Sequence, residues 1–66
     1  MKMDKVKFNI SLAKSKSSIS ELAKTANIST ATIHRGMRKG IKPKYIGLIA
    51  DALGVNVEDL IIHEED

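Results

Sequence analysis

The sequence predicts an all-α domain of five short helices joined by short turns. Apolar residues recur at the three- and four-residue spacing of helices that bury one face. Between these stretches stand serine, asparagine and glycine residues of the kinds that begin and end helices. The sequence has no cysteine and only two aromatic residues, Phe8 and Tyr45. We therefore expect residues 1–66 to form one small domain held together by closely packed aliphatic helices.

The first expected helix covers about Lys5 to Ser15, where the pattern is ambiguous. Val6, Ile10 and Ala13 recur at helical spacing. An alternating, strand-like pattern is also present at Val6, Phe8, Ile10 and Leu12. We favour a helix because the helical pattern continues directly into Ala13 and Lys14.

The second expected helix runs from Ile19 to Ala26. The preceding Ser18 and the following Glu21 match a capping box, in which each side chain accepts a hydrogen bond from the other residue's amide. The helix has a single apolar stripe made of Leu22, Ala23 and Ala26. Asn27 should end it, since asparagine tolerates the left-handed conformation found after many helices.

A third helix is expected from Thr30 to about Met37, with Ser29 as its N-cap. Two helices separated by a three-residue turn cannot lie side by side and must cross steeply. This is the helix-turn-helix arrangement.

The fourth and fifth helices follow a loop at Lys39–Lys42. The fourth is expected over about Lys44 to Leu53, with Gly54 as its C-cap. Its buried face should consist of Ile46, Ile49, Ala50 and Leu53. The last is a short helix capped by Asn56-Val57-Glu58-Asp59 that carries Leu60 and Ile61.

The charges are distributed unevenly. Residues 1–45 contain all eleven Lys and Arg and only two acids, a net charge of +9, whereas residues 46–66 contain six acids and neither Lys nor Arg, a net charge of −6. This asymmetry indicates a surface that faces a polyanion, with nucleic acid as the simplest candidate. Lysines that only solvate the surface are the alternative.

Two segments resemble the lambda-repressor-like, Cro/CI-type (XRE family) regulators. Residues 18–33, SISELAKTANISTATI, resemble their helix-turn-helix, and residues 49–60, IADALGVNVEDL, resemble their fourth and fifth helices. The resemblance extends from about Phe8 to Ile61. It implies a lambda-repressor-like fold with a helix-turn-helix at about 18–38. It also implies a sequence-specific double-stranded DNA-binding transcriptional regulator, a repressor of the phage or mobile-element type.

The resemblance places helix 29–37 in the major groove as the recognition helix. Its base-reading positions are Thr30, Ala31, Thr32, His34 and Arg35. Arg35 can donate two hydrogen bonds to one guanine, which contributes roughly 1–3 kcal/mol of discrimination. Ala31 and the methyl of Thr30 suit a thymine methyl. For Arg35 and His34 the alternative is a solvated surface side chain.

Phosphate contacts require cations, hydroxyls and amides. The residues expected to supply them are Ser18, Ile19, Ser29, Arg38, Lys39, Lys42 and Lys44. Ser18 and Ile19 would act through amides at a helix N-terminus. Gly40 would let the backbone approach the duplex.

The chain departs from the family pattern at four positions. Asn27 replaces a usual glycine, and Ile19 replaces a glutamine that often contacts the DNA backbone. Ser17 replaces an apolar residue between the first two helices. Gly36 lies where an apolar residue usually closes the recognition helix onto the core, so either the helix ends there or Met37 fills the space.

Other functional classes are disfavoured. The sequence shows no nucleophile–base pair, no carboxylate dyad and no glycine-rich phosphate loop, so we expect no enzyme and no cofactor or small-molecule ligand. His34 and His63 are far apart and there is no cysteine, so a metal site is not expected. No run of about 18 apolar residues is present, and we expect a cytoplasmic protein, bacterial or phage-encoded. An antitoxin that binds DNA and a toxin with the same fold is the main alternative, and the basic portion disfavours a protein–protein adaptor.

The expected partners are a double-stranded DNA operator and a second copy of the chain. Leu60, Ile61 and Ile62 cannot all face the core of one short helix, because successive side chains diverge by about 100°. At least one of them, Ile62 first, should be exposed and form a dimer interface near the acidic tail 63–66. A frayed tail with one exposed isoleucine is the alternative.

Overall fold

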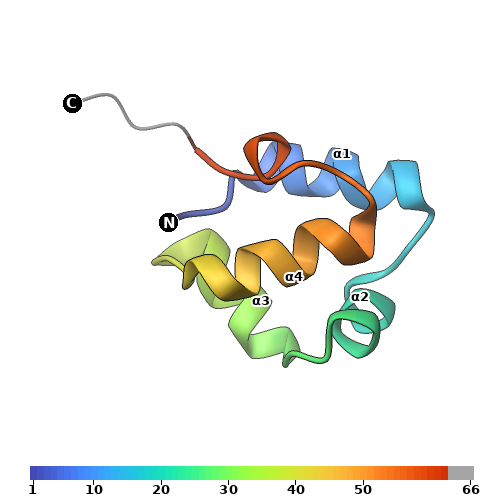
Figure 1. Cartoon of the computed structure of the whole chain (residues 1–66), viewed down its shortest axis with the longest axis horizontal. Helices are drawn as coiled ribbons and strands as arrows, with labels where there is room; N and C mark the ends of the chain where they lie inside the picture. Colours follow the sequence, from blue (N-terminus) through green and yellow to red (C-terminus); the bar gives the residue numbers. More distant parts are fainter. Residues whose placement is uncertain (63–66) are drawn as a thin grey trace.

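The computed structural model describes residues 1–62 and contains four α-helices and one short 3-10 helix (Figure 1). Their bounds are α1 Lys5–Ser15, α2 Ile19–Ala26, α3 Thr30–Arg38, α4 Pro43–Leu53 and η1 Val57–Asp59. The all-α class is confirmed, but the expectation of five helices is wrong. The segment after Asn56 makes only a single 3-10 turn. Ile61, two residues after that turn, forms an antiparallel β-bridge with Met3, and this pairing requires extended rather than helical backbone. The acidic tail 63–66 lies outside the described residues.

Helix α1 has the expected bounds but buries a different face. Val6 is 67 % exposed and Ile10 is 50 % exposed, while Phe8 is fully buried and Ser11 nearly so. The helix packs against α4 and η1, so its contacts with those elements, rather than the most regular apolar repeat, determine which side turns inward. Asp4 caps the helix by accepting a hydrogen bond from the Lys7 amide at 3.0 Å.

The helix-turn-helix forms as its capping signals predicted. The Glu21 amide donates to Ser18 Oγ at 3.1 Å, and the Ser18 amide donates to Glu21 Oε1 at 2.9 Å. Asn27 ends α2 in the left-handed conformation with φ 58°, and Ser29 begins α3 by accepting from the Thr32 amide. Helix α2 packs against both α3 and α4, burying the predicted stripe Leu22, Ala23 and Ala26.

Helix α4 begins one residue before its expected start. Pro43 occupies the first turn, where its missing N–H is not needed and its fixed φ suits the helix. Gly54 ends the helix with φ 71°. The buried face is the predicted one, made of Ile46, Ile49, Ala50 and Leu53.

An extended N-terminal arm, residues 1–4, lies between the end of α3 and residues 60–62, which we call the C-terminal segment. On one edge the Asp4 amide donates to the Leu60 carbonyl at 2.8 Å, and the Ile62 amide donates to the Lys2 carbonyl at 3.0 Å. On the other edge the Met3 amide donates to the Gly36 carbonyl at 2.9 Å. The arm therefore ties the end of α3 to the far end of the described chain.

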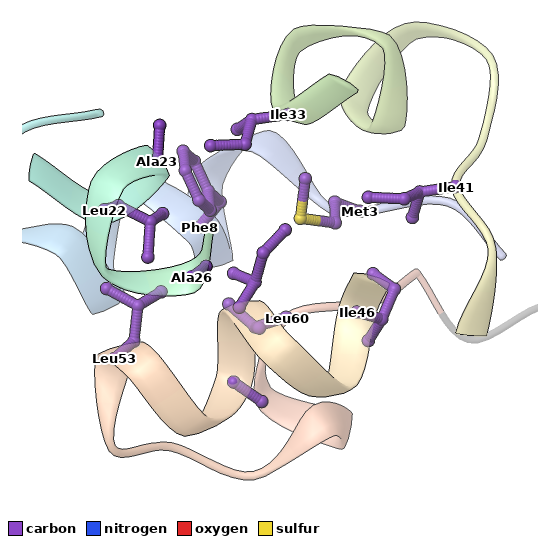
Figure 2. Packing of buried hydrophobic residues seen from close by; sticks show 12 residues of the cluster. Met3, Phe8, Leu22, Ala23, Ala26, Ile33, Ile41, Ile46, Leu53 and Leu60 are labelled. Atoms are coloured by element: carbon purple, nitrogen blue, oxygen red, sulfur yellow. The ribbon is translucent and has the colours of Figure 1, made fainter. Parts of the chain in front are cut away.

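The core gathers side chains from every α-helix, the arm and the C-terminal segment (Figure 2). Its members are Met3, Phe8, Leu22, Ala23, Ala26, Ile33, Ile41, Ile46, Ile49, Ala50, Leu53 and Leu60. Leu60 is fully buried, which corrects its assignment to a dimer interface: the core already covers its side chain. Ile61 is half-buried and Ile62 is 40 % exposed, in line with the expected divergence of these three side chains.

Gly36 resolves the question of how α3 ends. The helix continues through Gly36 to Arg38, so it does not stop there. Met37 stays half-buried and does not take the place of the missing side chain. Met3 fills it instead: its Cε atom lies 2.9 Å from the position that a Cβ on Gly36 would occupy.

Candidate nucleic-acid interface

Helix α3 presents a polar, cationic outer face. Ala31, Arg35 and Arg38 share one side of the helix at spacings of four and three residues, and all three are exposed. Thr30 and His34, also exposed, form the adjacent row. The inner side is held by Ile33, which is fully buried, and by Gly36. The helix contains no acidic residue, so its outer face presents no negative charge to an anionic partner.

The first turn of α3 is rigid. Ser29 Oγ accepts from the Thr32 amide at 3.1 Å and shares a second hydrogen bond with Thr32 Oγ1 at 2.8 Å. Both hydroxyls therefore have a protein partner. Of the three predicted base-reading residues in this turn, Thr30 and Ala31 are exposed to solvent, and Thr32 is half-buried.

An open groove of about 580 Å³ runs between α3 and the start of α4. It brings Arg35 and Thr32 together with Lys42. Its lining is completed by Met1, Gly40, Ile41, Pro43 and Tyr45. One predicted base-reading cation and one predicted phosphate-binding cation thus face the same space.

A second open groove of about 400 Å³ lies on the other flank of α3. It is lined by His34 and Arg38 from α3, together with Met37 and Lys5. His34 and Arg35 are neighbours in sequence, yet they border different grooves. The outer face of α3 is therefore a ridge with cations on both flanks.

The loop after α3 carries the remaining predicted phosphate contacts. Lys39, Lys42 and Lys44 are all exposed. Gly40 has φ 145°, which side-chain-bearing residues rarely adopt, so glycine here lets the loop turn. The start of α2 is less available than expected, because the Ser18 amide already donates to the Glu21 carboxylate. Ile19 lies half-buried against the core.

Comparison with protein families agrees with this geometry. Residues 7–66 match the family model described as Cro/C1-type HTH DNA-binding domain. The chain belongs to this family. No curated protein and no solved structure matches the chain. As a Cro/C1-type domain it is a DNA-binding regulator.

Two other properties of this Cro/C1-type domain concern the described residues alone. No helix among them combines the length and the apolar character needed to cross a membrane. Within residues 1–62 no three His, Asp or Glu side chains gather where they could hold a metal ion.

The sequence analysis did not identify several residues that line the two grooves. Lys5 and the arm residue Met1 lie beside α3 because the arm folds back across the molecule, and no local pattern signals that pairing. Tyr45 was a more accessible signal: it is the single tyrosine and stands near Lys42 and Lys44. Lys7, in contrast, does not join the cationic ridge, because its Nζ donates to the Ile61 carbonyl at 3.2 Å.

Proposed function

We propose that this chain is a sequence-specific double-stranded DNA-binding transcriptional regulator, a repressor of phage or mobile-element type that acts in the cytoplasm. The observation that carries the proposal is the exposed row of Ala31, Arg35 and Arg38 on a helix whose opposite side is firmly packed. A major groove accommodates one α-helix, and specificity depends on side chains that reach base edges. Arg35 is the principal base-reading residue of this proposal.

The geometry supports a division of the proposed DNA contacts into base contacts and phosphate contacts. With α3 in the major groove, Arg35 faces the bases, and Thr30 and Ala31 offer small apolar groups to a thymine methyl. Lys42 lines the same groove as Arg35 and is suited to the flanking phosphate. Arg38, Lys39 and Lys44 extend this cationic border and supply affinity that does not depend on sequence.

The test is a comparison of Arg35→Ala and Arg35→Lys. After the preferred duplex has been selected from random sequences, affinities for it and for a scrambled duplex are measured by fluorescence anisotropy. Arg35→Ala should lower the ratio of the two affinities by roughly 5- to 150-fold, the value of one bidentate guanine contact. Arg35→Lys keeps the charge without the planar fork, so it should lose most of the ratio while binding scrambled DNA normally.

Lys14→Ala is the matched control, since it removes one exposed cation from α1 and leaves α3 intact. It should leave the ratio of affinities unchanged. An Arg35→Ala variant that folds by circular dichroism and keeps the wild-type ratio would show that this side chain does not read bases.

We propose further that the regulator works as a homodimer. A single recognition helix contacts only a few base pairs, too few to mark a unique site among ~10⁶ or more competing sites. Two copies would read two half-sites about 34 Å apart. Ile62, together with the half-buried Ile61, remains the candidate contact near the C-terminal segment.

A further inference from the structure

The N-terminal arm makes hydrogen bonds to the elements that frame the groove beside Arg35. The Met3 amide donates to the Gly36 carbonyl at 2.9 Å, in the last turn of α3. The Ile41 amide donates to the Met1 carbonyl at 2.6 Å, in the loop between α3 and α4. The Met3 amide and the Met1 carbonyl of the arm thus connect the end of α3 to the loop that follows it.

The Met3 side chain is the anchor of the arm. It is fully buried, and it reaches into the space above Gly36 that any other residue at position 36 would fill. Figure 2 shows its sulfur between Ile33 of α3 and Ile41 of the loop, with Leu60 and Ile46 on the other side. Met3 therefore packs against both α3 and the loop through one side chain.

These contacts determine the shape of the groove. Met1, Gly40 and Ile41 line the same groove as Arg35 and Lys42. Lys42 directly follows Ile41, so the position of Ile41 sets where the Lys42 ammonium can reach. A loose arm would free this part of the lining and change the spacing between the base-reading arginine and the phosphate-binding lysine.

We infer that Met3 is a positioning residue for DNA recognition, holding the loop Lys39–Lys42 in register with α3 so that Arg35 and Lys42 engage the duplex together. The inference rests on the proposed function. It assigns a role in specificity to a buried residue outside the helix-turn-helix that touches no DNA itself. Contact groups require such support, because a small displacement of a polar side chain forfeits its hydrogen bonds.

The test compares Met3→Ala with Leu53→Ala. Both remove a buried side chain from the same core, but Figure 2 places Leu53 beside Leu22 and Ala26, away from Met3 and Ile41. Affinities for the selected and the scrambled duplex are measured at a temperature where circular dichroism shows all variants folded. Met3→Ala should lower the affinity ratio by about tenfold, within the range of one bidentate contact, and Leu53→Ala should not change it. Met3→Leu, which restores a side chain of similar volume, should recover most of the ratio.

A second readout needs no DNA. Hydrogen exchange of the Ile41 amide reports whether the arm is in place, because that amide donates to Met1. It should become faster in Met3→Ala and stay at the wild-type rate in Leu53→Ala. If Met3→Ala does not fold, Met3→Val carries the same two measurements with a smaller truncation.

The outcomes separate the two proposals. A wild-type ratio in the Met3 variants, or an equal loss in Leu53→Ala, would overturn the positioning role and leave the proposed function intact. A wild-type chain that binds all duplexes alike would contradict the proposed function, and with it the role of Met3.

Discussion

Gly36 is a helical position where the fold makes use of a missing side chain. A Cβ at this position would lie 2.9 Å from Met3 Cε and 3.1 Å from Ile41 Cβ. Met3 has a flexible end but is fully buried, and Ile41 is held by its hydrogen bond to the arm. Both side chains are buried in the core, so a shift that makes room for a methyl group disturbs their packing.

We expect Gly36→Ala to destabilise the protein by about 1 kcal/mol. Alanine in a helix interior gains roughly 0.5–1 kcal/mol over glycine, but inserting a methyl group into a packed core costs about 1–3 kcal/mol, so the steric term is larger. Urea unfolding followed by circular dichroism measures the change through the midpoint at constant m-value.

Gly47→Ala is the matched substitution, in the interior of α4. A Cβ there meets no atom within 4 Å. Only the helix-propensity gain remains, and this variant should be more stable by about 0.5–1 kcal/mol. Equal effects at the two glycines would show that Met3 and Ile41 yield without cost.

At the scale of elements, we expect the loop between α3 and α4 to contribute to the salt dependence of the affinity. Each phosphate contact contributes a slope of about −0.9 to log K against log salt concentration, so Lys42→Ala should make that slope shallower by about one unit. The affinity for all sequences should fall by a similar factor. Anisotropy titrations at several salt concentrations measure the slope.

Lys14→Ala again serves as the control for the loss of one positive charge. Its slope should equal that of the wild type. An unchanged slope for Lys42→Ala would remove this lysine from the phosphate-binding set, and a wild-type affinity that ignores salt would point to a protein partner.

The elements also show what sequence patterns could and could not predict. Helices α2 and α3 were predicted closely because their signals are local: Ser18, Asn27 and Ser29 act on backbone groups a few residues away. For α1 the spacing of apolar residues predicted a helix but not which face is buried. Val6 and Ile10 recur at the same spacing as core residues, yet both are exposed. The choice of face depends on α4 and η1, which lie far along the chain.

For the candidate site, too, the local features could be predicted from the sequence and the long-range contacts could not. The exposed face of α3 follows from its helical register, and the lysines of the loop follow from charge. The groove that joins Arg35 to Lys42 does not, because part of its lining comes from the arm. The arm supplies Met1 to the lining and is paired with Ile61 through Met3, and neither of these paired residues carries a local signal for the other.

For the whole molecule, the dimer prediction concerns the exposed end of the C-terminal segment. Ile62→Asp places a charge where an apolar contact is proposed, so it should weaken cooperative binding of two copies to a two-half-site duplex while sparing a single half-site. Sedimentation equilibrium with and without DNA measures the stoichiometry.

Leu48→Asp is the control, because Leu48 is an aliphatic side chain of similar exposure on α4. It should assemble on DNA like the wild type. The interface proposal fails if Ile62→Asp also does so, or if the wild-type chain occupies its site as one monomer.

The pairing of the arm with the C-terminal segment has a consequence for how the protein is made. Met3 is synthesised well before Ile61, its partner in the β-bridge, and before Leu60, whose carbonyl accepts a hydrogen bond from the neighbouring Asp4 amide. At typical elongation rates of about 5–20 residues per second, roughly 3 to 12 s pass between the synthesis of Met3 and that of Leu60. The capping residues of α2 and α3, Ser18, Asn27 and Ser29, are already present in the chain during this interval. Met3 can therefore take its full set of core contacts only after Leu60 and Ile61 have been synthesised.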